Sequence, residues 1–285
     1  MSKLPEVVQN RIANELYEAA AKSKEKDRFY LGMSQIGHDC PRKLWYDFRK
    51  YTPVPIDGRI KMLFRFGDRI EEEIIHHLKL AGYRVEDSQQ TFSAHNGFFK
   101  GHCDGIIHGV TFRPHILECK SANTKKFAKF KTYGVRKVYP IYYCQCQCYM
   151  GYSGLERALV VVQCKDTSEI YTERIHFNPF DFQSLHQRAY DIITANGPPE
   201  RIPDGMTCNY CDQRINCKFP EEGIVTEQFC GTCYYMGFKG LSSVCRHPDH
   251  PYKILTWGIK CDDWLSDTKK EPVNILRLPL EEIKC

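Results

Sequence analysis

The chain has 285 residues, which is long enough for one large hydrophobic core with a small appendage. Its hydrophobic content of 42% and charged content of 26% are ordinary for a globular protein, and the longest apolar run, residues 158–162, is too short to cross a bilayer. These values exclude a membrane-spanning helix, whereas the formal charge of +5 permits a nucleic-acid partner without requiring one.

The N-terminal residues 1–5 lack the apolar segment of a signal peptide, so we expect an intracellular, cytoplasmic protein with no membrane contact. The chain contains 15 cysteines, which is many for such a protein. Disulfides are rare in a reducing compartment, and clustered cysteines there favour metal binding.

Taken in chain order, the periodicity predicts alternating helices and short strands. The expected helices cover residues 5–27, 40–50, an amphipathic stretch that ends at Gly82, 123–133, 140–152 and 180–195. The expected strands cover about 83–93, 97–109, 112–120, 156–164 and 168–177. The apolar residues of the amphipathic helix recur at helical spacing and are Leu63, Phe66, Ile70, Ile74, Leu78 and Leu80.

This order of elements suits an α/β fold with a mixed central sheet flanked by helices. Residues 196–199, Asn-Gly-Pro-Pro, break the chain, and the sequence beyond them is rich in cysteine with little periodicity. We therefore expect a first domain over residues 1–220 and a small C-terminal module, stapled by metal, over residues 221–285.

Two carboxylates and a lysine form the strongest chemical signal. Asp104 lies in Gly-His-Cys-Asp-Gly at the end of an apolar-rich segment, and Glu118 and Lys120 follow in the next expected strand. Residues two apart on a strand share a face, so Glu118 and Lys120 point to one side and Cys119 to the other. Such a group can hold Mg²⁺ or Mn²⁺ with a water molecule, the minimum equipment for hydrolysing a phosphodiester.

Further ligands of this metal are expected from two other places. Glu71, in the amphipathic helix, is a third carboxylate, and the carbonyl group of Cys119 supplies an oxygen if the strand edge is open. Lys120 would position or deprotonate the attacking water and stabilise charge on the phosphate. An isolated Glu-x-Lys is usually a solvated pair, but the neighbouring motifs favour a site.

The helix over 140–152 places Gln145 and Tyr149 on one face, because they are four residues apart. They would contact the sugar–phosphate backbone or steady Lys120; the alternative is a half-buried helix with a satisfied polar face. Cys144, Cys146 and Cys148 alternate, which does not suit one helical face, so we expect small core residues there.

A cysteine triplet follows the chain break. Cys208, Cys211 and Cys217 offer three thiolates in one short segment, and Cys40, in Cys-Pro-Arg-Lys, is the candidate for a remote fourth. Thiolates in this pattern suit either zinc or an iron–sulfur cluster, and the spacing leaves both open.

A second cysteine group has the two-knuckle layout of a structural zinc site. The expected Zn²⁺ ligands are Cys230, Cys233, Cys245 and Cys261. His247 or His250 could replace one of them.

These motifs together resemble the PD-(D/E)xK nuclease superfamily, in particular its RecB-like branch with an iron–sulfur cluster, the CRISPR-associated Cas-four exonucleases and their phage-borne relatives. The resemblance covers roughly residues 30–220. It implies a restriction-endonuclease-like core, catalysis with one or two Mg²⁺ or Mn²⁺ ions, and a [4Fe-4S] cluster. It assigns catalytic roles to Asp104, Glu118, Lys120, Gln145 and Tyr149, and cluster ligation to Cys40, Cys208, Cys211 and Cys217. Many relatives carry histidine where this chain has Glu71, which affects the expected metal preference.

The sequence therefore predicts a metal-dependent DNA exonuclease that acts on single-stranded or frayed ends, in the cytoplasm of a bacterium or a phage-infected host. The candidate phosphate contacts are Arg42, Lys43, Arg59, Lys61, Arg65, Lys125, Lys126, Lys129 and Lys131. Two alternatives stay open: a non-catalytic DNA-binding adaptor on a nuclease-like fold, and a regulator organised by zinc alone. Polarity of cutting, the balance of exo- and endonuclease activity, pathway and oligomeric state are not determined by the sequence, and nothing in it excludes oligomers.

Overall fold

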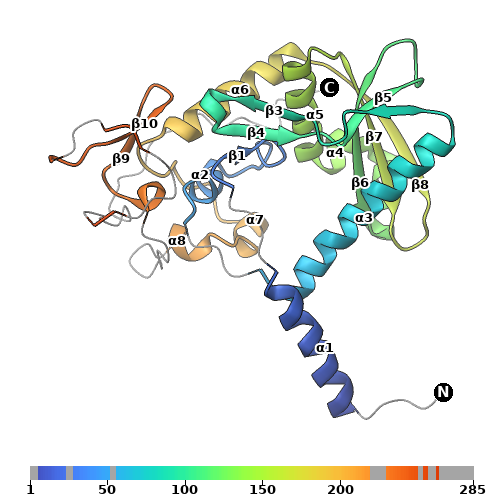
Figure 1. Cartoon of the computed structure of the whole chain (residues 1–285), viewed down its shortest axis with the longest axis horizontal. Helices are drawn as coiled ribbons and strands as arrows, with labels where there is room; N and C mark the ends of the chain where they lie inside the picture. The colour runs from blue at the N-terminus through green and yellow to red at the C-terminus, as the bar shows by residue number, and fades with distance from the viewer. Residues whose placement is uncertain are drawn as a thin grey trace.

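The computed structural model describes residues 6–23, 28–51, 56–218, 229–249, 253–255 and 261–262. Its centre is a five-stranded sheet in the order β2-β5-β6-β7-β8 (Figure 1). The strands are β2 (Arg84–Glu86), β5 (Gly105–His108), β6 (His115–Ala122), β7 (Arg157–Cys164) and β8 (Ile170–His176). The mixed α/β class expected from the sequence is confirmed.

Within this sheet, the described strands β6 and β7 pair in parallel and the other neighbours are antiparallel, with Glu118 opposite Val160 and Lys120 opposite Val162. A parallel pair needs a crossover, which α4 (Thr124–Val138) and α5 (Pro140–Ser153) supply on one side of the sheet. Helix α3 (Gly58–Leu80) packs on the strands from the other side (Figure 1).

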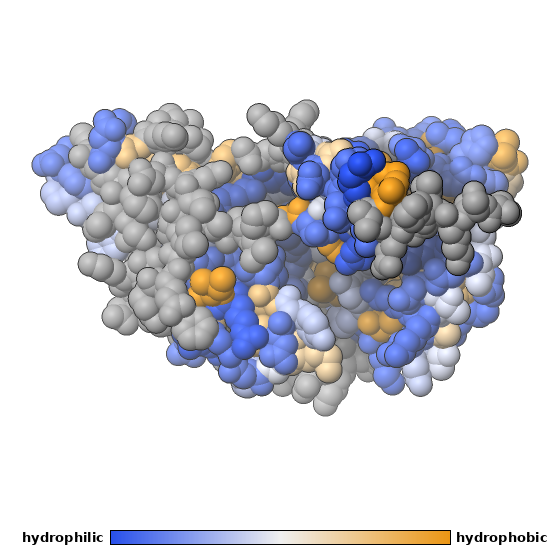
Figure 2. Space-filling model, turned by 90° about the horizontal axis from the view of Figure 1, so that it is seen from below, coloured by the Kyte–Doolittle hydropathy of each residue, from blue (hydrophilic) through white to orange (hydrophobic). Residues whose placement is uncertain are grey.

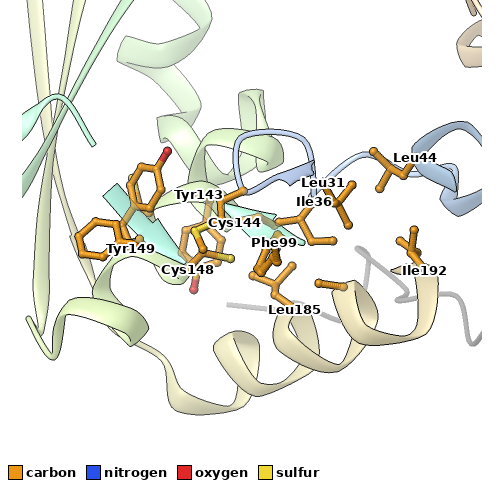
Figure 3. Close-up of a cluster of buried hydrophobic side chains, with 14 of the residues drawn as sticks. Leu31, Ile36, Leu44, Phe99, Tyr143, Cys144, Cys148, Tyr149, Leu185 and Ile192 are labelled. Carbon is orange, nitrogen blue, oxygen red and sulfur yellow. The ribbon is translucent and has the colours of Figure 1, made fainter. Parts of the chain in front are cut away.

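The main core lies between α5, α6 (Pro179–Thr194), α2 (Pro41–Phe48) and a small three-stranded sheet in the order β1-β4-β3 (Figure 3). The strands of this sheet are β1 (Leu31–Gly32), β3 (Thr91–Ala94) and β4 (Phe99–His102). Cys144, Cys146 and Cys148 are fully buried in this core, as the sequence predicted. Helix α5 is buried on nearly all sides, which is why its apolar residues do not form a single stripe.

The expected strands over 83–93 and 97–109 are each divided between the two sheets. Positive backbone φ angles at Asp87 and Gln89 turn the chain between β2 and β3, and residues 103–104 separate β4 from β5. Alternation of apolar residues identifies an extended segment but not the sheet that it joins, so the sequence predicted one long strand in each place.

Helix α1 (Glu6–Ala21) packs against the first half of α3, and together they project from the rest of the molecule as an arm (Figure 1). Of the apolar residues in the predicted amphipathic helix, Ile70 and Ile74 are buried against the sheet. Leu63, Phe66 and Leu80 are instead 43%, 47% and 70% exposed. A helical period shows which residues share a face, but it does not show how far along the helix that face is covered.

The cysteine-rich region consists of α7 (Met206–Asn209), α8 (Arg214–Lys218), a 3₁₀ turn, η2 (Cys230–Thr232), and the hairpin of β9 (Met236–Lys239) and β10 (Ser242–Cys245). Cys233, Met236 and Phe238 belong to the main hydrophobic core. The guanidinium group of Arg49, in turn, lies over the rings of Trp45 and Phe238. The described part of residues 221–285 thus shares its hydrophobic core with the first 220 residues. No helix in the described ranges is long and apolar enough to span a membrane.

Candidate active site

Strand β6 positions the central carboxylate and lysine. Glu118 is fully buried and Lys120 is 19% exposed at the side chain, and their side chains form an ion pair. Residues two apart on a strand share a face, so both side chains point to the same side of the sheet. This is the α5 side, because Gln145 of α5 contacts Glu118. The alternation predicted for this strand therefore places both side chains in one site.

Helix α5 holds Glu118 in place. The side-chain amide of Gln145 donates to Glu118 Oε1 at 2.7 Å and to the hydroxyl oxygen of Tyr149 at 3.0 Å. The hydroxyl group of Tyr149 donates in turn to the carbonyl of His102 at 2.8 Å. Gln145 and Tyr149 are 4% and 1% exposed, so in this structure they contact Glu118 and the His102 carbonyl from inside the core, and their side chains do not face the solvent from which a DNA backbone would approach.

Gly101 makes this arrangement sterically feasible. A side-chain carbon at that position would lie 2.6 Å from the Tyr149 ring and 2.8 Å from Cβ of Met33. The glycine in Gly-His-Cys-Asp-Gly therefore allows α5 to approach β4 closely enough for the tyrosine to reach His102.

Asp104 immediately precedes β5. It lies beside the part of β6 that extends beyond the β5–β6 pairing. The pairing of β5 with β6 ends at Gly105 and Leu117, so the edge of β6 at Cys119 has no strand partner on that side. The carboxylate of Asp104 accepts a hydrogen bond from the backbone N–H of Cys119 at 2.6 Å. Because the N–H and C=O of one strand residue point the same way, the Cys119 carbonyl faces this open edge as well.

Glu71 comes from α3 and lines an open groove of about 630 Å³ together with Asp104. Gln89 donates to Glu71 Oε1 at 2.7 Å. Asp68, Glu72 and His76 line the same groove. Helical spacing of four from Asp68 to Glu72 to His76 is the signal that could have identified them.

The three carboxyl groups share an environment that disfavours their charges. Burial, followed by the neighbouring Asp104 and Glu71 charges, raises the pKa of Glu118 to about 8. Burial and the Asp104 charge raise the pKa of Glu71 to about 7, and burial also raises the pKa of Asp104. Burial opposes the charge of Lys120, but Glu118 and Asp104 raise its pKa above the ordinary value, so Lys120 holds its proton here.

One carboxylate oxygen of Glu118 indicates whether a divalent cation fits between Glu118 and Asp104. Glu118 Oε2 is buried and has no hydrogen-bond partner among the described residues, which is costly unless something else binds it. Within the ranges that the structure describes, no three His, Cys, Asp or Glu side chains are grouped closely enough to hold one metal ion. In this arrangement the ammonium group of Lys120 neutralises Glu118. The unpartnered oxygen and the open edge at Asp104 are nevertheless a suitable set of oxygen donors for a hard divalent cation.

The candidate phosphate contacts divide into two groups. Arg42 is 5% exposed and donates to the carbonyl of Pro199 and the hydroxyl of Tyr46, so its expected contact with DNA is wrong. Lys43 is paired with Asp47 and Asp212, which makes it a structural residue too.

The remaining candidates are better placed. Lys125, Lys129 and Lys131 are exposed on α4, with Lys131 paired to Glu169. Lys126 lies 3.6 Å above the ring centroid of Tyr139, and Lys120 lies 5.1 Å from that of the neighbouring Tyr142. Arg59 and Arg65 are exposed on the arm, whereas Lys61 donates to the carbonyls of Ala21 and Ser23.

The predicted cluster cysteines come together from opposite ends of the first domain. Cys40, Cys208, Cys211 and Cys217 line one cavity between α2 and the segment that contains α7 and α8. Burial raises the pKa of Cys40, and the nearby Cys217 and Cys208 raise it further. Cys40 also caps α2 by accepting the Lys43 N–H, which explains why the helix starts at Pro41.

In the second cysteine group, Cys230 lies in η2 and Cys245 ends β10, and among the described residues these thiols do not form a group close enough to hold a metal ion. Burial raises the pKa of Cys230 to about 11, with further contributions from Cys233, Cys261 and Cys245. His247 lies within 3.7 Å of Asp249 and packs its ring on Tyr235. His250 lies outside the described residues.

Comparisons with known proteins found a family match in the central region of the chain. Residues 37–156 match the YqaJ-like viral recombinase domain. This range contains Glu71, Asp104, Glu118, Lys120 and both α5 residues that hold Glu118, whereas the later cysteines lie outside it. The match agrees with the expectation of a DNA-processing enzyme of recombination.

Several solved structures are similar in part, and no curated protein matches the chain. A structure described as SSO0001 is 17% identical, with a TM-score of 0.48, over 75% of this chain and 98% of its own. The alkaline exonuclease LHK-Exo from Laribacter hongkongensis is 15% identical, with a TM-score of 0.43, over 63% and 90%. A phage-related exonuclease from Haemophilus somnus 129PT is 14% identical, with a TM-score of 0.45, over 57% and 91%.

Proposed function

We propose that this protein is a divalent-metal-dependent DNA exonuclease that acts in phage-type recombination, preferentially on single-stranded or frayed ends. The observation that carries the proposal is the buried, unpartnered oxygen of Glu118 beside Asp104 and Lys120. These residues lie inside the matched recombinase domain, which supports a nuclease over a non-catalytic adaptor. Its DNA substrate implies a cytoplasmic location in a bacterium or phage-infected cell.

Glu118, Asp104, the Cys119 carbonyl and Glu71 would hold Mg²⁺ or Mn²⁺. When bound, the ion supplies a polarised phosphoryl oxygen and a water of lowered pKa. Lys120 keeps its proton at Nζ and stabilises negative charge on the phosphate, and Gln145 and Tyr149 fix the Glu118 carboxylate in its orientation. Asp104 also ties the open edge of β6 through the Cys119 N–H.

The DNA would reach this site over α4 and along α3. Lys125, Lys129 and Lys131 are exposed beside the end of β6, and Lys126 stands over Tyr139 close to the catalytic lysine. Contacts from ammonium groups to phosphates bind any sequence, which suits an exonuclease. Arg65 would contact the strand at α3.

The test is time-resolved digestion of end-labelled single- and double-stranded DNA with Mn²⁺ or Mg²⁺. Wild-type protein should shorten linear DNA from an end and leave circles and blocked ends intact, and Lys120→Ala should be inactive. Equal activity in both proteins would refute the site. No activity in either, with DNA binding retained, would favour the adaptor.

We also propose that the cysteines bind two metal centres. Cys40, Cys208, Cys211 and Cys217 would hold a [4Fe-4S] cluster that joins the two ends of a nuclease domain over 1–220. The cavity that they share supports this, because it brings Cys40, at the start of the well-packed α2, together with three thiols from the segment of α7 and α8. Cys230, Cys233, Cys245 and Cys261 would hold a structural Zn²⁺ in a module over 221–285.

Anaerobic purification and metal analysis test both centres. A brown protein with broad absorbance at about 400 nm and about four iron atoms per chain would support the first, and one zinc per chain the second. A colourless protein that contains zinc alone would refute the cluster and favour the regulator organised by zinc.

A further inference from the structure

The arm formed by α1 and the first half of α3, Gly58–Gly67, exposes more apolar surface than its packing explains. Phe64 and Phe66 are 54% and 47% exposed, and the adjacent Met62 and Leu63 are each 43% exposed. Single exposed apolar residues need no explanation, but here four exposed apolar side chains within five residues lie around the helix, so whichever side faces a partner presents apolar surface. From below, apolar and hydrophilic residues lie side by side on the surface (Figure 2).

From residue 59 to residue 69 of α3, the exposed charged side chains are three arginines and one carboxylate, that of Asp68. Arg59, Arg65 and Arg69 are exposed on the same helix. None of the three forms an ion pair with any carboxylate that the structure describes, whereas Arg11 on α1 pairs with Glu15. Unpaired arginines interleaved with exposed aromatic rings form the combination that binds single-stranded nucleic acid, because the rings stack on bases while the cations contact phosphates.

The geometry of α3 connects this surface with the active-site groove. Phe64, Asp68 and Glu71 are spaced by four and then three residues, so they lie along one stripe of the helix. Asp68 and Glu71 line the groove that contains Asp104. Seven residues at 1.5 Å each separate Phe64 from Glu71 by about 10 Å along the helix axis, a few nucleotides of an extended strand.

We infer that residues 58–69 of α3 bind the single-stranded segment of the DNA substrate next to the cleaved end, with Phe64 stacking on a base and Arg59, Arg65 and Arg69 contacting phosphates. This inference rests on the proposed nuclease function and adds the path of the strand. The basic charge and the continuity with the groove favour DNA over a second copy of the chain. An interface between copies of this surface would place six unpaired arginines close together.

Binding without catalysis tests the inference separately from the nuclease activity. The full chain, in EDTA, is titrated against a fluorescent single-stranded oligothymidylate. Phe64→Ala should weaken binding about tenfold, the change produced by about 1.4 kcal/mol of lost stacking, and Phe64→Tyr should restore it. Replacing Arg59, Arg65 and Arg69 with alanine should reduce the slope of log Kd against log salt concentration by about 2.

Two matched variants serve as controls. Phe180→Ala removes an aromatic side chain that is 82% exposed on α6, and Arg11→Ala removes an arginine of the arm that already has a carboxylate partner. Both should bind the oligonucleotide as wild type does. Melting curves show whether each variant is folded.

Each outcome supports or overturns the inference. Unchanged affinity and salt slope in folded Phe64→Ala and in the triple arginine variant overturn it. So does a change of molar mass by light scattering in Phe64→Ala with unchanged DNA affinity, because the arm would then be an interface between copies. If wild type binds DNA through the arm but does not cut it with Mn²⁺, the proposed nuclease function is refuted, whereas the inference that the arm binds single-stranded DNA is still supported.

Discussion

The carboxylate site on β6 and the cavity lined by Cys40, Cys208, Cys211 and Cys217 are held together by different means. Glu118 is fixed by hydrogen bonds from a helix that is buried on nearly all sides. The cysteine cavity instead lies between α2 and a segment with two short helices, and only Cys40 is part of a well-packed element. The protein core therefore preorganises the first region, whereas the second would gain most of its order from the proposed cluster.

The largest expected effect separates chemistry from folding in the first region. Lys120→Ala should lower the rate of DNA hydrolysis by about 10³-fold, because it removes the charge that stabilises the phosphate. The melting temperature in the presence of Mg²⁺ should change little by comparison. Lys165→Ala, at an exposed lysine in the β7–β8 turn, should leave the rate unchanged, and a similar loss there would show that the effect is not specific to the site.

Cys208→Ser should affect the second region in the opposite way. Through the proposed cluster, the thiols of Cys40 and Cys208 would close a loop of 168 residues, counted as the difference between their positions. Losing that closure should cost about 4 kcal/mol of unfolding free energy. Urea denaturation monitored by circular dichroism measures it.

Cys164→Ser is the control for this loss, since Cys164 is a buried thiol outside both cysteine groups that already shares a hydrogen bond with Thr124. It should unfold at nearly the wild-type urea concentration. Equal stability of the two variants would contradict the stapling role.

Gln145→Ala should have an intermediate effect on the first region. It leaves Glu118 Oε1 without its amide donor and frees the Tyr149 hydroxyl, so we expect about a tenfold to hundredfold lower kcat with a smaller change in KM. Tyr149→Phe removes one donor to a carbonyl and should cost less. A larger loss of kcat from Tyr149→Phe than from Gln145→Ala would contradict the proposal that Gln145 is the main group holding Glu118.

The smallest expected effect is the pH dependence of stabilisation by Mg²⁺. The pKa of Glu118 is raised to about 8 from an ordinary value of 4.5, so its contribution to stability is fully present below about pH 4.5 and is lost as the pH rises to about 8. Metal binding displaces the proton, so the increase in melting temperature caused by Mg²⁺ should grow, by a few degrees, as the pH rises through this range. Thermal melts across this range check it, and Glu118→Gln should reduce the pH dependence to the part that Glu71 and Asp104, whose pKa values are also raised, contribute.

Local patterns predicted most elements of the fold. Cys40-Pro41 starts a helix because the thiol accepts the Lys43 N–H, and Gly82 follows α3 with a positive φ. Periodicity could not predict that the 83–109 region contributes to two sheets, since that depends on partners elsewhere in the chain. It also could not distinguish Arg42, which is buried by contacts with Tyr46 and Pro199, from an exposed arginine.

The sequence by itself determined the residues of the candidate site: the carboxylates at 104 and 118, the lysine two positions later, and the spacing of the cysteines. Covalent connectivity and the period of a strand were enough for that, because both are local. Only the tertiary structure showed that Gln145 and Tyr149 hold Glu118 from within the core, that one carboxylate oxygen remains unpartnered, and that exposed aromatic and arginine side chains lead along α3 to Glu71. Burial and partnership arise from contacts between distant segments, and no local pattern specifies them.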